Sequence, residues 1–132
     1  MEHKTIEGGI KRILIVDDEP TILLTLSHAL KKDGIEVMLS RKIESAEEAL
    51  NRYIFDLVIA DIRMSGMYGI EGLELCSYIK EKSPKTEVII MTAYGSDEMK
   101  EEAYKRGAYQ YYEKPINIDD LLKKCAALGI PV

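Results

Sequence analysis

Five short runs of β-branched and other apolar residues recur along the chain, and longer segments with apolar residues at helical intervals separate them. The runs are RILIVD (12–17), IEVMLS (35–40), FDLVIAD (55–61), TEVIIMT (86–92) and AYQYYEK (108–114). Such runs predict β-strands, and the segments between them predict amphipathic helices. Because parallel strands need a helix-length connection, the alternation predicts an α/β fold with a single open five-stranded parallel sheet and helices on both faces.

The intervening segments carry apolar stripes and signals of helix ends. The stripes expected to face the core are Ile22/Leu23/Leu26/Leu30, Ala46/Ala49/Leu50/Tyr53, Leu73/Cys76/Ile79, Met99/Ala103 and Leu121/Leu122/Cys125. The glycines of Asp33-Gly34 and Arg106-Gly107 predict helix ends, and Asn117 predicts the N-cap of the last helix. The 132 residues predict one domain, with a flexible tail over 1–10 and a folded part over 11–130.

Composition and charge exclude several classes of protein. The contents of 46% hydrophobic and 31% charged residues are those of a globular domain. The net charge of −5 argues against direct nucleic-acid binding, because phosphate contacts need clustered Lys and Arg. No run approaches the roughly 18 apolar residues of a membrane span. Cys76 and Cys125 stand in no metal-ligand pattern, which favours buried thiols in a reducing compartment. We therefore expect a soluble cytoplasmic protein without membrane contact.

Polar residues stand where four of the predicted strands end. They are Asp17, Asp18 and Glu19 after the first run, Asp61 in the third, Thr92 in the fourth and Lys114 in the fifth. We expect these side chains to converge, because function in open parallel sheets gathers at the carboxyl ends of the strands. Clustered carboxylates repel one another unless a cation joins them, and their hard oxygen atoms suit Mg²⁺ or Mn²⁺. An alternative for Asp17 and Asp18 is that they cap a helix beginning at Pro20.

In these residues the chain resembles a response-regulator receiver domain of two-component signalling, the CheY-like superfamily, from about Lys11 to about Leu128. The motifs that carry the resemblance are VDDEP, VIADIRM, IIMTAYG and YYEKPI. Each motif is common alone, but the four occur in the family's order and each ends its own predicted strand. The resemblance implies a flavodoxin-like (βα)5 fold with strand order 2-1-3-4-5. It also implies a cis peptide bond between Lys114 and Pro115.

The resemblance further implies a phosphoryl-transfer site. Asp61 would accept a phosphoryl group from a phosphohistidine of a sensor histidine kinase or of a phosphotransfer protein. Lys114 and Thr92 would bind phosphoryl oxygens as the other catalytic residues. The implied cofactor is Mg²⁺ (or Mn²⁺), with the ligands Asp17, Asp18, Asp61 and the backbone carbonyl of Arg63. Such a domain catalyses its own phosphorylation and dephosphorylation, and no independent metabolic activity is expected.

The family's switch maps onto two residues of this chain. The Thr92 hydroxyl would move toward the phosphoryl group, and the Tyr111 ring would rotate inward. An alternative for Tyr111 is a static core tyrosine. The implied partners are a downstream output domain or protein and a second copy of the chain. That copy would bind through the face of the fourth helix, fifth strand and fifth helix. Tyr104, Tyr109 and Tyr112 are candidates for this face, and the alternative for them is half-buried tyrosines at the edge of the sheet.

The sequence departs from the family's pattern after Asp61, where it runs DIRMSGMYGIEGLEL. Ser65 stands where proline is usual, and extra residues fall near 67–69. We expect this extended loop over 65–71 to alter phosphoryl lifetime or kinase docking. Arg63 and Tyr94 occupy variable positions that flank the attacking water's route in the family.

Two other functions stay open at this stage. One is a phosphatase with an aspartyl nucleophile, which would also use Mg²⁺ and a lysine. Its nucleophile usually lies in a DxD pattern, whereas Asp61 is followed by Ile62 and Arg63. The other is a receiver-like interaction module that works without phosphorylation.

Overall fold

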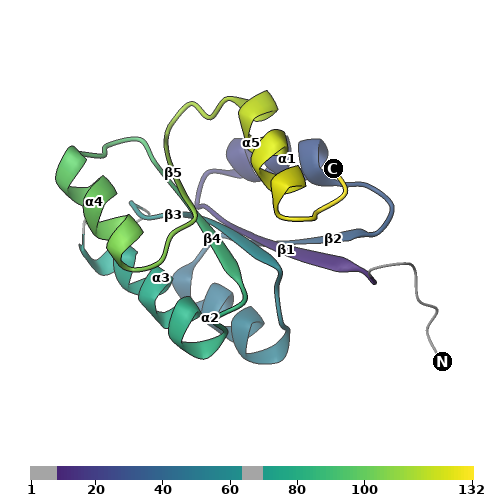
Figure 1. Ribbon diagram of the computed structural model, residues 1–132, viewed down its shortest axis with the longest axis horizontal. Helices are drawn as coiled ribbons and strands as arrows, with labels where there is room; N and C mark the ends of the chain where they lie inside the picture. The colour runs from purple at the N-terminus through teal and green to yellow at the C-terminus, as the bar shows by residue number, and fades with distance from the viewer. Residues whose placement is uncertain (1–8, 64–69) are drawn as a thin grey trace.

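The computed structural model describes residues 9–63 and 70–132, without the side chains of 70–72. Its strands are β1 (Lys11–Val16), β2 (Ile35–Ser40), β3 (Leu57–Asp61), β4 (Glu87–Thr92) and β5 (Gln110–Glu113). The helices are α1 (Pro20–Leu30), α2 (Ile43–Arg52), α3 (Ile70–Lys82), α4 (Asp97–Lys105) and α5 (Ile118–Ala127). The strands form one parallel sheet in the order β2-β1-β3-β4-β5 (Figure 1). The predicted α/β class, five-stranded sheet and strand order are confirmed.

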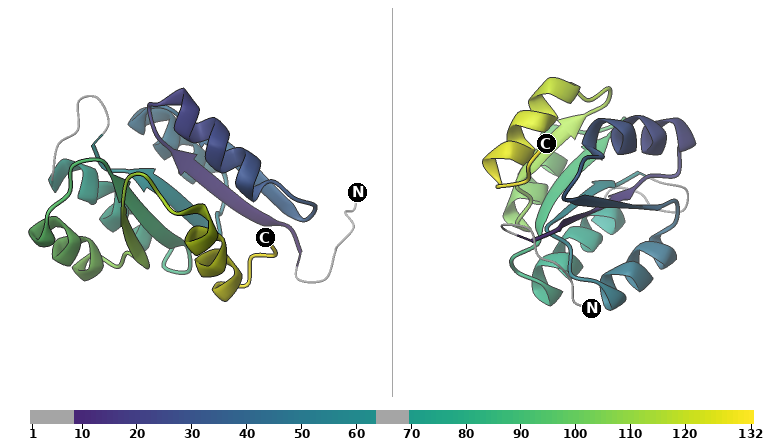
Figure 2. Two further views of the ribbon diagram at one scale, coloured as in Figure 1. Left: turned by 90° about the horizontal axis from the view of Figure 1, so that it is seen from above. Right: turned by 90° about the vertical axis from the view of Figure 1, so that its right-hand side faces the viewer.

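The helices cover both faces of the sheet, α1 and α5 on one and α2, α3 and α4 on the other (Figure 2). Side chains of β1 alternate between the two layers. Leu14 and Val16 pack with α2, α3 and α4, whereas Ile13 and Ile15 pack with α1 and α5. Successive side chains of a strand point to opposite faces, so a strand covered on both sides must be apolar throughout. This burial explains the continuous apolar runs in the sequence.

The helix ends agree with the sequence at two of the three predicted places. Gly107 follows α4 in a left-handed conformation (φ 101), and the Asn117 side chain accepts the N–H of Asp120 at 2.9 Å as the N-cap of α5. The predicted helix end at Asp33-Gly34 is wrong, because α1 already ends at Leu30. Gly34 instead takes its left-handed conformation (φ 88) in the turn into β2.

The predicted apolar stripes form the core with one clear exception. Tyr53, the residue after α2, is 37% exposed, whereas Ala46 and Leu50 of that helix are buried in the core. The guanidinium carbon of Arg12 lies 4.9 Å from the centroid of its ring. Cys76 and Cys125 are both buried free thiols, as predicted.

The tail predicted over 1–10 falls mostly outside the described residues, and so does most of the extended loop over 65–71. The domain boundaries at 10 and 130 therefore stay predictions. Among the described residues, no helix has both the length and the apolar character that crossing a membrane requires.

Candidate functional site

Four strands bring the polar residues of the sequence to one edge of the sheet. Asp17 follows β1, Asp61 ends β3, Thr92 ends β4 and Lys114 follows β5, and these strands are consecutive neighbours in the sheet. Asp17, Asp61 and Thr92 are almost completely buried. The backbone N–H of Lys114 donates to the carbonyl of Thr92 at 2.8 Å, which fixes the end of β5 against β4. The predicted convergence at the carboxyl edge is confirmed.

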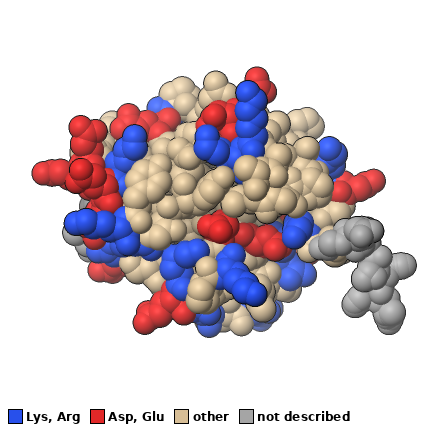
Figure 3. Space-filling model, viewed as in Figure 1, with Lys and Arg blue, Asp and Glu red and all other residues tan. Residues whose placement is uncertain are grey.

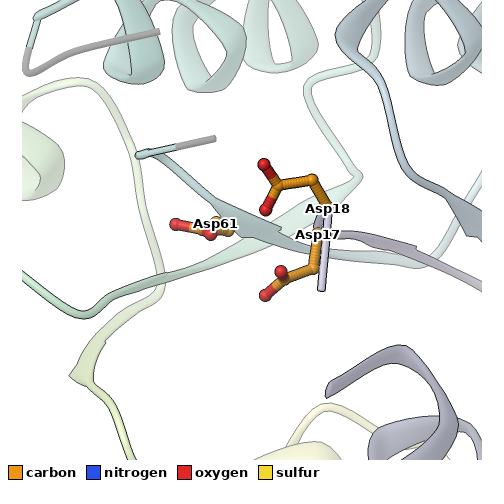
Figure 4. Close-up of side chains that lie close together, drawn as sticks. All are labelled: Asp17, Asp18 and Asp61. Atoms are coloured by element: carbon orange, nitrogen blue, oxygen red, sulfur yellow. The ribbon is translucent and has the colours of Figure 1, made fainter. Parts of the chain in front are cut away.

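Three carboxylates form a cluster at this edge. One oxygen each of Asp17, Asp18 and Asp61 lies within 4.8 Å of the others, and Figure 4 shows the three side chains directed toward a common space. Two of the carboxylates are held by N–H groups two residues further along the chain. Asp17 Oδ1 accepts the N–H of Glu19 and Asp61 Oδ1 accepts the N–H of Arg63, both at 2.9 Å. Each of these carboxylates therefore has a fixed orientation.

The helix-capping alternative does not describe Asp17. Glu19 is the N-cap of α1, and its side chain makes no capping hydrogen bond. Asp17 accepts the N–H of Glu19 itself, whereas a capping side chain accepts an N–H from the first turn of its helix. Pro20 begins α1, as expected for a residue that lacks an N–H. The buried position of Asp17 is thus explained by the carboxylate cluster and not by the helix.

Lys114 joins the carboxylates. Its Nζ donates to Asp17 Oδ2 at 2.8 Å, to Glu19 Oε1 at 3.0 Å and to Asp61 Oδ2 at 3.2 Å. The lysine side chain is 11% exposed, and Glu19 is the exposed member of the group. Glu19 had no predicted role, and only its place beside Asp17 and Asp18 in the sequence pointed to it. In the structure it completes the set of acceptors around the ammonium group.

The cluster holds more negative than positive charge. Burial raises the pKa of Asp17 above its ordinary value, and the hydrogen bond from Lys114 opposes that shift. Burial alone would lower the pKa of Lys114, but its hydrogen bonds to Asp17 and Glu19, with the charge of Asp61, raise it. One ammonium thus faces several carboxylates in a largely buried site. Oxygen donors of this kind at this spacing fit a hard divalent cation such as Mg²⁺.

Two side chains beside the cluster contact each other. The guanidinium carbon of Arg63 lies 5.6 Å from the centroid of the Tyr94 ring, at a cation–π distance. Tyr94 is 71% exposed, and its N–H donates to Thr92 Oγ1 at 3.1 Å. Arg63 and Tyr94 follow Asp61 and Thr92 by two residues each, so their contact lies at the same edge of the sheet.

The predicted switch tyrosine points inward. Tyr111 is 5% exposed and packs with the α2, α3 and α4 layer, and its hydroxyl has no hydrogen-bond partner among the described residues. Its backbone N–H donates to the Tyr104 hydroxyl at 3.2 Å. Of the tyrosines expected on an exposed face, only Tyr104 is exposed, at 39%. Tyr109 and Tyr112 are half-buried against the other layer. The Lys114-Pro115 peptide bond is cis, as predicted.

The fold and the site together define an α/β domain with a lysine-bridged acidic site at the carboxyl edge of its sheet. The family model described as "Response regulator receiver domain" matches residues 13–126. The chain therefore belongs to the receiver domains of response regulators, the phospho-accepting domains of two-component systems.

Curated relatives and solved structures agree with this family. The chain is 36% identical over 111 residues to the response regulator protein PilR of Pseudomonas aeruginosa, covering 84% of the chain and 24% of PilR. It is 39% identical over 121 residues to the transcriptional regulatory protein ZraR of Escherichia coli K12, covering 92% of the chain and 26% of ZraR. The chain thus spans about a quarter of the length of these relatives.

Among solved structures, the beryllofluoride-activated NtrC4 receiver domain dimer superposes with a TM-score of 0.81 at 31% identity. The match covers 90% of this chain and 96% of that one. The likeness therefore extends over nearly the whole domain and is not confined to the site.

Proposed function

We propose that Asp61 accepts a phosphoryl group from a phosphohistidine of a sensor histidine kinase or of a phosphotransfer protein. The signal then passes to a downstream output domain or protein. The observation that carries the proposal is the ammonium of Lys114 within 3.2 Å of Asp61 and 2.8 Å of Asp17, beside the third carboxylate of Asp18. We further propose that the protein works in the cytoplasm, which agrees with its two buried free thiols.

The proposed reaction exchanges one bond of phosphorus for another. A carboxylate oxygen of Asp61 attacks phosphorus, the P–O bond forms as the P–N bond to the histidine breaks, and the imidazole leaves with the electron pair and takes a proton from solvent. The ammonium of Lys114 stabilises negative charge on one phosphoryl oxygen, and the Thr92 hydroxyl donates to another.

The carboxylates would hold the cofactor. We assign Asp17, Asp18, Asp61 and the backbone carbonyl of Arg63 as the residues that bind Mg²⁺ or Mn²⁺. Such an ion supplies positive charge that neutralises the carboxylates and the incoming phosphoryl oxygens. The buried position of Asp17 and Asp61 supports this assignment, because two such carboxylates with one lysine leave uncompensated negative charge.

The proposed output is a change at Thr92 and Tyr111. These residues lie on neighbouring strands, since β4 pairs with β5 over Ile90↔Tyr111 and Thr92↔Glu113. Movement of the Thr92 hydroxyl toward a phosphoryl group would bias the Tyr111 ring between two positions. We propose that the altered α4, β5 and α5 face then binds a second copy of the chain. The similar NtrC4 receiver domain is a dimer in its beryllofluoride-activated form, which supports this proposal.

The test is a direct measurement of the covalent adduct. The protein is incubated with Mg²⁺ and acetyl phosphate, and the intact mass is measured beside that of Asp61→Asn. We expect wild type to gain the mass of one phosphoryl group. The gain should be lost when EDTA removes the metal, and it should be absent in Asp61→Asn.

A matched control separates the nucleophile from a general loss of charge. Asp33→Asn removes a carboxylate from an exposed turn and should gain the same mass as wild type. A wild-type protein that gains no mass from acetyl phosphate is then tested with a phosphorylated histidine kinase. Failure with both donors would overturn the proposal, and equal labelling of Asp61→Asn would place the adduct elsewhere.

A further inference from the structure

We infer that Gly95, in the connection between β4 and α4, is a positioning residue that allows the Tyr111 ring to take its inward position. A Cβ built on Gly95 would overlap the Tyr111 hydroxyl oxygen, and it would lie 3.1 Å from Tyr111 Cζ. It would also lie 3.0 Å from Cγ2 of Thr92. Because glycine has no side chain, the space beside Cα of Gly95 is free for the Tyr111 hydroxyl.

The backbone does not require glycine at this position. The described glycines with positive φ are Gly9, Gly34, Gly107 and Gly129, and Gly95 is not among them. Gly95 therefore does not need the left-handed conformation that favours glycine over other residues. Only the space around its Cβ prevents a larger residue, and that space is bounded by the two residues of the proposed switch.

The inward position of Tyr111 depends on packing and not on a polar contact. Its hydroxyl is buried without a hydrogen-bond partner among the described residues, and such burial costs free energy. Burial raises the pKa of Tyr111, and the nearby Ser96 backbone opposes that shift without reaching hydrogen-bond geometry. No well-formed hydrogen bond therefore holds the hydroxyl, so we expect the ring to be what shifts when a methyl group is added at residue 95.

The atom that a Cβ at residue 95 would overlap is the hydroxyl oxygen of Tyr111. A variant without that oxygen therefore distinguishes a clash with the hydroxyl from a general distortion of the loop. Replacing Tyr111 by Phe removes that oxygen and leaves contacts of 3.0–3.1 Å, which a shift of a few tenths of an ångström relieves. Gly95→Ala should therefore displace a tyrosine at residue 111 but tolerate a phenylalanine there.

The experiment compares wild type, Gly95→Ala, Tyr111→Phe and the double variant. NMR with a soluble paramagnetic agent measures the solvent exposure of the ring protons of residue 111. In Gly95→Ala we expect their relaxation enhancement to rise toward that of Tyr94, which is 71% exposed. In the double variant the ring should stay as protected as in Tyr111→Phe alone. Assignment is simple in Tyr111→Phe and in the double variant, because the wild-type chain contains a single phenylalanine, Phe55, whereas in wild type and Gly95→Ala the Tyr111 ring is assigned by comparison with the spectrum of Tyr111→Phe.

Two results would overturn the inference. One is a Tyr111 ring that stays protected in Gly95→Ala. The other is a ring that becomes exposed to the same extent in Gly95→Ala and in the double variant, which would mean that the methyl group distorts the loop whatever residue faces it.

The consequence for signalling rests on the proposed function and is measured separately. After treatment with acetyl phosphate, Gly95→Ala should gain the phosphoryl mass of wild type while its Tyr111 ring remains exposed. That result would separate phosphorylation from the switch. A wild type that gains no mass counts against the proposed function alone, because the ring measurement on the untreated proteins still decides the role of Gly95.

Discussion

At the scale of single residues, the site depends on one ammonium group. Lys114 contacts three carboxylates, and two of them, on Asp17 and Asp61, are nearly inaccessible to water. A buried charge that loses its partner is destabilising by several kcal/mol, whereas exposed ion pairs contribute little. The free energy of unfolding should therefore respond to the loss of this lysine far more than to the loss of a surface lysine.

Lys114→Met tests this dependence. We expect the variant to lose about 3 kcal/mol of unfolding free energy without metal, because Asp17 and Asp61 remain buried without a counter-charge. Mg²⁺ should then stabilise the variant more than wild type. Urea unfolding with Mg²⁺ and with EDTA measures both effects. Lys124→Met is the matched control, since its 3.5 Å pair with Asp120 is partly exposed and should contribute less than about 0.5 kcal/mol. Equal losses in the two variants would contradict the prediction.

Residues at strand ends were predictable and their side-chain partners were not. The sequence placed Asp17, Asp61 and Lys114 at one edge, because strand ends follow from apolar periodicity and the edge follows from a parallel sheet. It assigned no partner to Glu19, and it did not indicate that Gly95 borders Tyr111. Both contacts depend on rotamers of residues far apart in the chain, about which local periodicity carries no information.

At the scale of elements, β5 is connected to α5 by one short hydrogen bond. The Tyr112 hydroxyl donates to Asp120 Oδ2 at 2.5 Å, and Asp120 lies in the first turn of α5. This hydrogen bond is the main cause that lowers the pKa of Asp120 below its ordinary value, with Lys124 also contributing. A carboxyl group whose pKa is lowered in the folded state stabilises the fold above its unfolded pKa, and this contribution is lost as pH falls through the folded pKa.

Tyr112→Phe removes this connection without changing the ring. We expect the pKa of Asp120 to rise toward its ordinary value. As the pH is lowered below about 4, the free energy of unfolding should then decrease less steeply in the variant than in wild type. An NMR titration of the Asp120 carboxyl carbon measures the shift directly. Tyr78→Phe is the control, because the Tyr78 hydroxyl donates to the amide oxygen of Asn51 at 3.1 Å and to no described carboxylate. An unchanged Asp120 titration in Tyr112→Phe would refute the assignment.

Element boundaries show why local signals were incomplete. The glycine of Asp33-Gly34 predicted the end of α1, but the helix ends at Leu30 and Lys32 forms an isolated antiparallel bridge with Ile35. The Ile35 N–H donates to the Lys32 carbonyl at 3.0 Å, so Gly34 belongs to the turn that leads into β2, and a glycine signal alone does not distinguish such a turn from a helix end. Asn117 was predictable because its side chain satisfies an N–H only three residues away.

At the scale of the whole molecule, one face remains available for the proposed second copy. Acidic and basic side chains both gather at the left of the molecule in Figure 3, where α4 lies. Helix α4 carries Asp97 and Glu98 in its first turn and Lys105 in its last turn. Tyr104 is the exposed aromatic residue of this helix, and its hydroxyl accepts the backbone N–H of Tyr111 on the edge strand β5 at 3.2 Å. Tyrosine is among the residues enriched at positions that contribute most to the binding free energy of an interface.

The self-association prediction uses two exposed tyrosines. Phosphorylated wild type should sediment as a dimer, and Tyr104→Ala should weaken the dimer about tenfold, since the loss of a central aromatic side chain costs more than about 1 kcal/mol. Tyr94→Ala removes an exposed tyrosine that precedes α4 and should leave the dimer unchanged. A phosphorylated protein that stays monomeric at all concentrations, or equal weakening by both substitutions, would exclude this face.

The distance along the chain between Lys114 and Asp17 has a consequence during synthesis on the ribosome. The two residues are 97 positions apart, and β5 is also the last strand of the sheet to be made. A nascent chain that ends before β5 already contains Asp17, Asp18 and Asp61 but lacks both the ammonium group and the edge strand. The last strand of this sheet therefore completes its edge, and Lys114 directly after that strand supplies the missing counter-charge.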